Sequence, residues 1–548
     1  MSTETTTKSD PLEKFRKLDT ISPFELKDEL GRIANLAKDT QTFLNAGRGN
    51  PNWIATTPRE AYWLFGTFGI EESKRVWDDK DLGGMPDKNG IGARFDAFIA
   101  KHAKDPGAEM LKRGIEYGVK ELGFEKDAWV YELTDAIIGD MYPVPPRMGV
   151  HMEKVVCKYL VHEMCGDSPP TGKYDVFAVE GGTAAMCYIF DTLMVNGLLK
   201  RGDKIALAMP TFTPYIEIAH LDRYSFEIVE VNASSLYESG AHSWQYPDSE
   251  IDKIADPAIK AFFVVNPSNP PSYAMARSSL ERTTKIVREK RKDLIIITDD
   301  VYGTFVEGFE SLMKWAPRNT ITVYSFSKYF GCTGWRLGAI AVHENNVFDE
   351  MIAALPESEK QRLRKRYGPL TLTPDKIKFI DRLVADSRQI ALNHTAGLSM
   401  PQQVMMTFFA LFDLTDTGAA YKHLTRKICQ SRLEQLWKGM NLPLVPDPLR
   451  AGYYSTLDLM KWAELTYGDG FMKYLAANYH PLQIVFALAT YHAIVLLNGS
   501  GFGAPDWSVR VSLANLPDKA YKEIGADLVQ VAQTALERWK QQEAKAKA

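Results

Sequence analysis

Short apolar runs alternate with helical patterns between about residues 174 and 342. Seven of these runs are typical of β-strands: 175–179, 204–208, 225–231, 261–265, 294–298, 320–324 and 337–342. Several of the seven are apolar nearly throughout. Continuous apolar strands are typical of parallel sheets that are covered on both faces. The pattern therefore predicts an α/β fold with a doubly wound, mostly parallel sheet.

A helical face follows Gly182 inside this block. Outside the block the pattern changes: residues 355–393 are densely charged and contain two prolines, which predicts a solvated insertion of exposed helices joined by turns. Helical patterns from about residue 403, a strand at 509–513 and a charged final helix complete the chain. The apolar stretch 484–497 is too short for a membrane span, so we expect buried interior and no membrane partner.

Charge and cysteine content exclude several classes of protein. The 548 residues carry 65 Lys and Arg against 69 Asp and Glu, a net charge of −4, which predicts no nucleic-acid partner. Five cysteines without a C-x-x-C pair favour neither a disulfide framework nor a zinc site, so we expect no metal. A cytoplasmic location is the simplest expectation, with residues 1–10 as a loose polar tail.

The strongest candidate for chemistry is a lysine that follows a predicted strand. Residues 325–336 read S-F-S-K-Y-F-G-C-T-G-W-R, so Lys328 stands between hydroxyl and aromatic side chains. Most lysines only make a surface soluble, but burial at a strand end lowers an amine pKa and produces a nucleophile or base. The planar fork of Arg336 suits a phosphate, and the hydroxyls of Ser325 and Ser327 can complete its binding site.

A second candidate phosphate site lies where a predicted strand turns into a helix. Residues 180–185 read E-G-G-T-A-A, so backbone N–H groups at Gly182 and Thr183 can meet an anion at the helix N-terminus. An ordinary helix cap by Thr183 explains the segment about as well.

These two segments resemble the fold-type I pyridoxal-phosphate (PLP) enzymes of the aspartate aminotransferase superfamily, and the other motifs of that family follow in order over about residues 45–515. The resemblance implies a large PLP-binding domain at about 141–400. It implies a smaller α/β domain built from 1–140 and 401–548, with helical insertions at about 65–130 and 355–393. It also implies a homodimer at least, because family active sites are completed across a two-fold interface.

The resemblance implies that PLP is attached to Lys328 and held by several other side chains. Phe212 in P-T-F would stack on the pyridine ring, although core packing is a fair alternative. Asp299 in D-D-V-Y would keep the ring nitrogen protonated, with Asp300 as the competing candidate. The phenolic oxygen would meet Tyr302 and Asn269, the latter in N-P-S-N-P-P, which departs from the family pattern N-P-x-N-P-T-G.

Further residues are implied to bind the phosphate or the substrate. Tyr142 would reach the phosphate of the neighbouring subunit. Arg510 in S-V-R-V-S would grip the substrate α-carboxylate in a two-pronged ion pair, where Asn269 also contributes. Gly49 in G-R-G-N-P-N-W would offer its N–H to a carboxylate. Arg48 beside it is the available cation of this loop, and we expect it to orient the β-carboxylate or to help protonate the enamine region, with a structural loop arginine as the equal alternative.

Within the superfamily, the motifs and the two insertions most resemble the L-aspartate 4-decarboxylase group. That resemblance implies β-decarboxylation of L-aspartate to L-alanine and CO2, with a secondary transaminase activity that uses a 2-oxo acid. Ordinary aspartate or aromatic aminotransferase activity remains the alternative. A non-catalytic regulator with the same fold is disfavoured, because Lys328, Asp299, Arg336 and Arg510 are all present.

Overall fold

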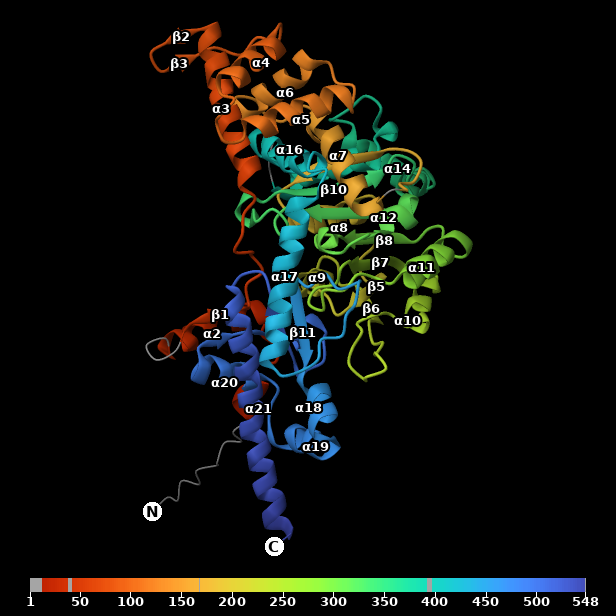
Figure 1. Ribbon diagram of the computed structural model, residues 1–548. Helices are drawn as coiled ribbons and strands as arrows, with labels where there is room; N and C mark the ends of the chain where they lie inside the picture. The colour runs from red at the N-terminus through yellow and green to blue at the C-terminus, as the bar shows by residue number, and fades with distance from the viewer. Residues whose placement is uncertain (1–11, 38–41, 167, 392–396, 548) are drawn as a thin grey trace, which may run out of the picture.

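Seven strands form the central sheet of the molecule, drawn in Figure 1. The computed structural model describes residues 12–37, 42–166, 168–391 and 397–547, so the expected N-terminal tail lies outside the described residues. All seven predicted strands are confirmed to within two residues, in the spatial order β4-β10-β9-β8-β7-β5-β6. Their bounds are β4 (Tyr174–Val179), β5 (Lys204–Met209), β6 (Glu227–Asn232), β7 (Ile259–Val265), β8 (Ile295–Asp299), β9 (Thr320–Ser325) and β10 (Gly338–His343).

The sheet is mostly parallel, as predicted, but one strand is reversed. Strands β5 to β9 pair in parallel, whereas β10 runs antiparallel to both β4 and β9. A parallel return needs a crossover that is usually helical, and the connection 326–337 contains only the 3-10 turn Thr333–Trp335. Apolar composition does not reveal the reversal, because a strand covered on both faces is apolar in either direction.

Helices cover both faces of the sheet, which is the doubly wound arrangement that the pattern predicted. One face packs against α8 (Gly182–Val195), α9 (Thr213–His220) and α13 (Val347–Ala353). The other face packs against α7 (Val150–Cys165), α10 (Asp248–Asp252), α11 (Arg277–Glu289), α12 (Leu312–Trp315) and α16 (Met400–Leu414).

The charged segment 355–393 is only partly the solvated insertion that we expected. Helix α14 (Glu357–Tyr367) carries its charges at the surface, but α15 (Phe379–Ala391) packs against α8. Phe379 and Leu383 are fully buried in the core that α8 shares with the sheet. The prediction is wrong for α15 because the neighbouring charges concealed a stripe of apolar side chains at helical spacing.

Four helices and a small hairpin fill the segment between the N-terminal loop and α7. They pack on α7 and α16 at the upper end of the molecule in Figure 1, around an aromatic cluster of Phe65, Phe68 and Phe95. The elements are α3 (Thr56–Val76), β2 (Asp78–Asp79), β3 (Leu82–Gly83), α4 (Ile91–Lys101), α5 (Ala108–Lys120) and α6 (Lys126–Ile138).

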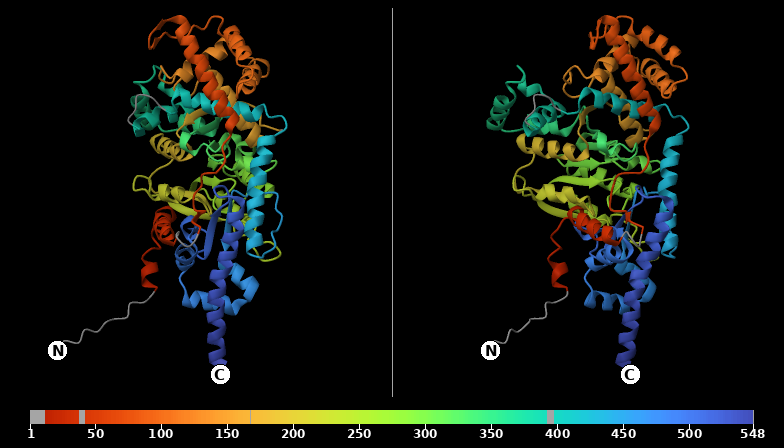
Figure 2. Two further views of the ribbon diagram at one scale, coloured as in Figure 1. Left: turned by 60° about the vertical axis from the view of Figure 1, so that its left-hand side comes forward. Right: turned by 90° about the vertical axis from the view of Figure 1, so that its left-hand side faces the viewer.

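Segments from the N-terminal and C-terminal parts of the described chain meet at the lower end of the molecule in Figure 1. Strand β1 (Leu44–Asn45) pairs in parallel with β12 (Ile494–Val495), and β11-β14-β13 form a three-stranded antiparallel sheet. Helices α17 and α21 lie side by side, as Figure 2 shows. The remaining bounds are α1 (Glu13–Arg16), α2 (Pro23–Ala37), α17 (Ala420–Gly439), β11 (Tyr454–Asp458), α18 (Leu459–Tyr467), α19 (Asp469–Asn478), α20 (Leu482–His492), β13 (Leu497–Asn498), β14 (Ser508–Ser512) and α21 (Asp518–Lys547).

The apolar stretch 484–497 is interior along one face of α20 and in the residues that follow, as expected, whereas Tyr491 is 69% exposed. It forms most of α20 and reaches β13, and Leu488, Ile494 and Leu497 are fully buried. In the ranges that the structure describes, no helix has both the length and the apolar character needed to cross a membrane.

Candidate functional site

A cavity of about 220 Å³ opens at the carboxyl ends of the parallel strands. This edge of an open α/β sheet is where such folds place their ligands. Residues far apart in the sequence meet there, and twelve of the residues singled out from the sequence line the cavity: Gly49, Gly182, Thr183, Phe212, Asn269, Asp299, Tyr302, Ser325, Ser327, Lys328, Arg336 and Arg510.

Two of the predicted residues do not line this cavity. Tyr142 is 76% exposed and lies outside this cavity. Arg48 is exposed and lines a separate surface pocket with Arg32 and Asn515. The loop turns at this point, so that Gly49 faces the cavity while the side chain of Arg48 lies outside it.

Lys328 reaches the cavity from the loop that follows β9. Its Nζ donates a hydrogen bond to the carbonyl oxygen of Gly49 at 3.1 Å, and the hydroxyl of Tyr453 donates to the same oxygen at 2.8 Å. The amine is therefore held against the N-terminal loop in the cavity, with no acidic side chain hydrogen-bonded to it among the described residues.

Asp299, at the end of β8, supplies a buried carboxylate. Tyr215 Oη donates to its Oδ2 at 2.5 Å, and the backbone N–H of Val301 donates to Oδ1 at 3.2 Å. Burial raises the pKa of Asp299 to about 6, against the lowering effect of these hydrogen bonds and of the positive charge of Lys328.

The structure separates Asp299 from its competitor, Asp300. Asp300 accepts hydrogen bonds from Thr298 and Ser311 and does not line the cavity. Successive residues at a strand end point to opposite sides, which explains why only one of the two carboxylates faces Lys328.

A cup for an anion lies at the N-terminus of α8. Gly181 is the N-cap residue with a φ of 92°, and no side chain caps the helix, so the structure does not support the alternative that Thr183 is an ordinary cap. The guanidinium of Arg336 lies so close to Gly181 that a Cβ there would collide with it. Ser325 Oγ donates to Ser327 Oγ at 2.9 Å on the adjoining side of the cavity.

Arg510, on β14, is a buried cation without a carboxylate partner among the described residues. It is 1% exposed, and it donates to Asn269 Oδ1 at 3.2 Å and to the Gly47 carbonyl at 2.9 Å. Its Nε is buried and makes no hydrogen bond, and burial lowers the pKa of the guanidinium. Because an unpaired buried charge is costly, this arrangement suits an anionic ligand.

Sequence reasoning missed two tyrosines that line the cavity, Tyr215 and Tyr454. Tyr215 stands three residues after Phe212 at the start of α9, and this helical spacing was the signal that could have revealed it. Tyr454 opens β11 directly after Gly452-Tyr453, outside every quoted motif.

The residues present fit PLP in three respects. The cup at α8 with Arg336, Ser325 and Ser327 suits its phosphate, and Lys328 suits its aldehyde carbon. Buried Asp299 suits its ring nitrogen, because a carboxylate favours the protonated ring. Three further cofactor candidates line the same cavity, Phe212, Asn269 and Tyr302, whereas Tyr142 does not.

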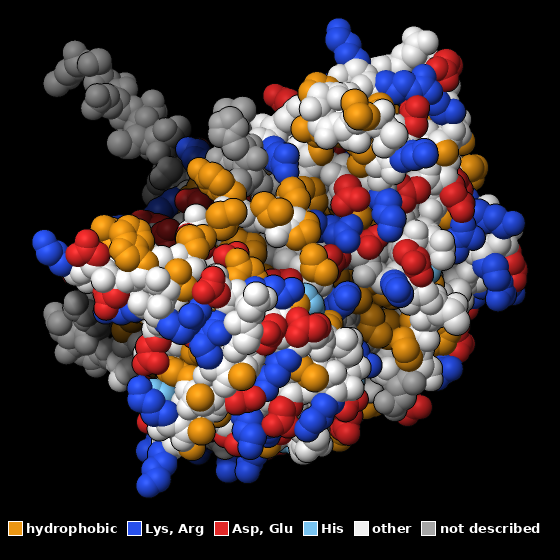
Figure 3. All heavy atoms as spheres, turned by 90° about the horizontal axis from the view of Figure 1, so that it is seen from above, with side chains coloured by type: hydrophobic (Ala, Val, Ile, Leu, Met, Phe, Trp, Pro, Cys, Tyr) orange, Lys and Arg blue, Asp and Glu red, His pale blue; other side chains and the backbone are white. Residues whose placement is uncertain are grey.

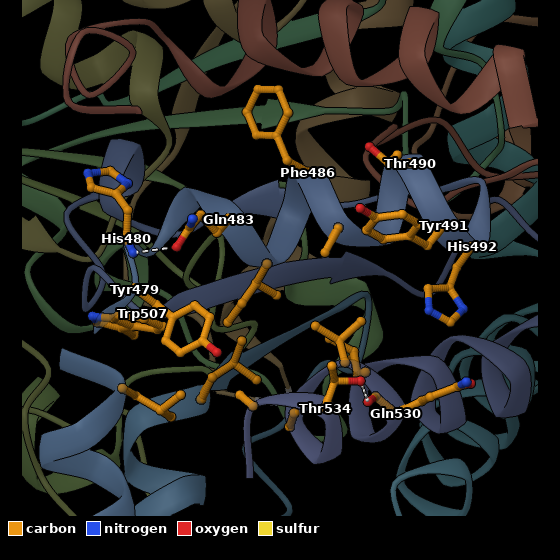
Figure 4. Close-up of a pocket in the computed structure, with 18 of the residues that line it drawn as sticks. Tyr479, His480, Gln483, Phe486, Thr490, Tyr491, His492, Trp507, Gln530 and Thr534 are labelled. Atoms are coloured by element: carbon orange, nitrogen blue, oxygen red, sulfur yellow. Dashed lines mark hydrogen bonds between the residues drawn. The ribbon is translucent and has the colours of Figure 1, made fainter. Parts of the chain in front are cut away.

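A larger cavity of about 670 Å³, shown in Figure 4, lies between α20, α21 and the loop before β14. Its two histidines are paired with acids, His480 with Asp19 and His492 with Asp527. None of the residues singled out from the sequence line it, and its lining has no buried pair of amine and carboxylate like Lys328 and Asp299 in the smaller cavity.

The pKa of Asp299 predicts a pH dependence for PLP binding. The carboxyl is ionised above about pH 6 and protonated below it, so it loses its attraction for a protonated ring nitrogen as the pH falls. We expect the Kd for PLP to rise by up to about tenfold per pH unit below pH 6. Absorbance titrations between pH 5 and 8 measure this change.

Asp299→Asn is the control for that titration. The phosphate of PLP titrates near the same pH, and its contribution persists in the variant. We expect a shallower profile for Asp299→Asn, with weaker binding at pH 8. Identical profiles for the two proteins would show that Asp299 is not the titrating group.

Comparison with known proteins gives a consistent result. Residues 177–527 match the family described as aminotransferase class I and II. A bifunctional aspartate aminotransferase and L-aspartate beta-decarboxylase from Pseudomonas sp. is 47% identical over 528 residues, which cover 96% of this chain and 98% of that protein.

More distant relatives share parts of the sequence or the fold alone. An aspartate aminotransferase of Pyrococcus abyssi is 29% identical over 43% of this chain and 58% of its own length. The solved structure of a Thermus thermophilus aspartate aminotransferase double mutant superposes with a TM-score of 0.57 at 16% identity, covering 94% of this chain and 98% of that one.

Proposed function

The chain belongs to the family of class I and II aminotransferases, and from that premise we propose that it is a PLP-dependent enzyme that converts L-aspartate to L-alanine and CO2. A secondary transaminase activity uses the same site with a 2-oxo acid. The observation that carries the proposal is the buried guanidinium of Arg510, which has no acidic partner among the described residues and lies in the same cavity as the amine of Lys328. The full-length relative with both activities in its name supports it.

The cavity residues hold and activate the cofactor. When bound, PLP supplies an acceptor for the electrons that are released on the substrate carbons as bonds to them break. Lys328 would hold it through the amine, and Gly182, Thr183, Ser325, Ser327 and Arg336 would bind its phosphate. Asp299 would keep a proton on the ring nitrogen, and the hydroxyl of Tyr215 holds Asp299 in place by its hydrogen bond to Oδ2.

Substrate recognition follows from the charges of the cavity. Arg510 binds the α-carboxylate through its guanidinium, which has no acidic partner among the described residues and whose Nε makes no hydrogen bond. Asn269 holds the guanidinium in position by accepting one of its hydrogen bonds. Once the substrate occupies the site, the freed amine of Lys328 accepts the α-proton. The hydrogen bond to Gly49 keeps this amine beside the loop on which the β-carboxylate would lie.

The β-carboxylate requires a looser contact than the α-carboxylate. A tight ion pair would stabilise the charged ground state, and that stabilisation is lost as CO2 forms, so strong binding opposes decarboxylation. Arg48 is an exposed cation next to Gly49, without an ion pair to any described residue. We assign it the role of orienting the β-carboxylate by a long, solvated contact.

An Arg48→Ala variant tests this role. We expect the ratio of alanine to oxaloacetate to fall by about tenfold, because a misoriented β-carboxylate departs more slowly. Arg32→Ala is the matched control, since Arg32 lines the same surface pocket but pairs with Glu29 at 2.7 Å. An unchanged rate and ratio in Arg48→Ala would remove Arg48 from the reaction.

Product analysis separates the proposed function from ordinary transamination. Purified protein is incubated with PLP and L-aspartate, with and without added 2-oxo acid, and alanine and oxaloacetate are quantified. We expect continued formation of alanine without a 2-oxo acid, and oxaloacetate as a minor product. Oxaloacetate alone, formed only when a 2-oxo acid is added, would make the protein an aminotransferase.

We also propose that the chain assembles at least as a homodimer in the cytoplasm. Apolar side chains lie exposed at the end formed by α3 to α6, toward which Figure 3 looks, and three of them, Trp63, Ile70 and Trp77, recur every seven residues on and just beyond α3. A dimer would let Tyr142 contact the phosphate site of the partner. All five cysteines are free thiols, which suits a reducing compartment.

A further inference from the structure

Tyr454 lines the Lys328 cavity, and neither the family motifs nor the mechanism above gives it a role. It opens β11, and its side chain is only 2% exposed. Pairing of β11 with β14 sets its position, because Thr456, two residues further on, lies opposite Arg510. Residues two apart on a strand share a face, so the backbone directs Tyr454 toward the end of the cavity that Arg510 occupies.

The hydrogen bonding of Tyr454 leaves its own proton available. Tyr302 Oη donates to Tyr454 Oη at 3.0 Å, and the Tyr454 hydroxyl donates to no acceptor among the described residues. A hydroxyl has one proton and two acceptor positions, so a tyrosine that accepts one hydrogen bond can still donate one to a substrate.

The hydroxyl lies between the base and the carboxylate-binding cation. A Cβ built on Gly49 would lie 2.7 Å from Tyr454 Oη and 3.1 Å from Lys328 Nζ, so the two groups converge on one point beside the loop. The guanidinium of Arg510 lies 4.3 Å from the centre of the Tyr454 ring. A buried positive charge beside the ring favours the negative charge that remains on Tyr454 after proton transfer.

Building on the proposed function, we propose that Tyr454 is the acid that protonates the β-carbon of the substrate when CO2 leaves. The bond between the β-carbon and its carboxylate breaks, and the electron pair stays with the substrate. The O–H bond of Tyr454 then breaks, and its proton forms the new C–H bond of the alanine methyl group. Water returns a proton to the phenolate after product release, so one proton is consumed per L-aspartate.

This step also determines which product forms. CO2 that is still in the cavity can recombine with the β-carbon until a proton arrives there, so prompt protonation makes decarboxylation irreversible. The formation of oxaloacetate needs no proton at the β-carbon. Removing the hydroxyl should therefore slow the formation of alanine far more than the formation of oxaloacetate.

Tyr454→Phe tests the proposal in the PLP-loaded protein. We expect the rate of alanine formation to fall by about 10²- to 10⁴-fold, the usual contribution of a general acid. Oxaloacetate formation with an added 2-oxo acid should change by less than about fivefold. The absorbance of bound PLP should match that of the wild type, which shows that the cavity is intact.

Tyr453→Phe is the matched control. Tyr453 is the neighbouring buried tyrosine, and its hydroxyl binds the Gly49 carbonyl rather than facing the substrate. A purely structural effect on the loop should change both products together and leave their ratio unaltered. If Tyr454→Phe also leaves the ratio of alanine to oxaloacetate unaltered, Tyr454 is not the proton donor.

A second variant covers the case in which Tyr454→Phe does not fold. Site-specific replacement of Tyr454 by a difluorotyrosine keeps the hydroxyl and nearly the same shape while lowering the pKa of the phenol. The pH at which the rate of alanine formation declines on the alkaline side should then move to a lower value. An unchanged pH profile contradicts the proposal. Failure of the wild type to form any alanine would instead overturn the proposed function itself, so the two failures are distinguishable.

Discussion

Lys328→Ala should abolish both the decarboxylation and the transamination of L-aspartate, with a loss of at least about 10⁴-fold in kcat. The variant removes the group that holds the cofactor and the base that accepts the α-proton. No other lysine lines the cavity, so no described side chain can take over its role. Initial rates of alanine and oxaloacetate formation at saturating PLP measure the loss.

Lys204→Ala is the control for that variant. Lys204 begins β5 at the surface, where it pairs with Glu227, and such exposed ion pairs contribute little to stability. We expect wild-type rates for Lys204→Ala. More than a tenth of the wild-type rate in folded Lys328→Ala would mean that the chemistry takes place elsewhere.

Arg510→Leu should lower kcat/KM for L-aspartate by about 30- to several thousand-fold. Losing one partner of a buried charge pair costs about 2–5 kcal/mol, and each 1.36 kcal/mol corresponds to a factor of ten. Steady-state kinetics measure the effect, and the structure accounts for its size because Arg510 is almost fully buried.

Arg510→Lys separates charge from geometry. It keeps the positive charge but loses the planar fork that binds a carboxylate through two parallel hydrogen bonds. We expect a kcat/KM between those of the wild type and Arg510→Leu. Equal kcat/KM values for Arg510→Leu and the wild type would show that the α-carboxylate binds elsewhere.

Sequence patterns predicted the central sheet because its strands are buried on both faces. The apolar runs that became β7 and β8 are rich in β-branched and aromatic residues, which favours strands, and their ends are correct to within two residues. The reversal of β10 was not predictable from composition, since it depends on the connection that carries Lys328. The burial of α15 was missed because the many charged residues of the segment 355–393 predicted an exposed segment. The apolar side chains at helical spacing, which include Phe379 and Leu383, were not recognised.

Most of the candidate site was predictable because its residues follow strand ends in contiguous motifs. Gly182, Asn269 and Lys328 come shortly after strands of one sheet and Asp299 ends another, and the carboxyl ends of parallel strands meet at one edge. Tyr454 was not predictable in this way. It comes from a different sheet, and only the tertiary packing of β11 against the cavity brings its hydroxyl near Lys328.

The position of Arg48 illustrates a further limit. Sequence adjacency placed it with Gly49, but consecutive residues in a turning loop face different directions. The structure puts Gly49 in the cavity and Arg48 in a surface pocket. Its role therefore depends on the Arg48→Ala variant rather than on proximity in the sequence.

The most direct test of the central claim is to follow L-aspartate labelled with ¹³C at one carboxyl group. The PLP-loaded protein is incubated without added 2-oxo acid, and ¹³C NMR follows the label. We expect substrate labelled at carbon 4 to release its label as CO2 in step with the formation of L-alanine, and substrate labelled at carbon 1 to retain it in alanine. Label from carbon 4 that stays in oxaloacetate, without release of CO2, would contradict the account.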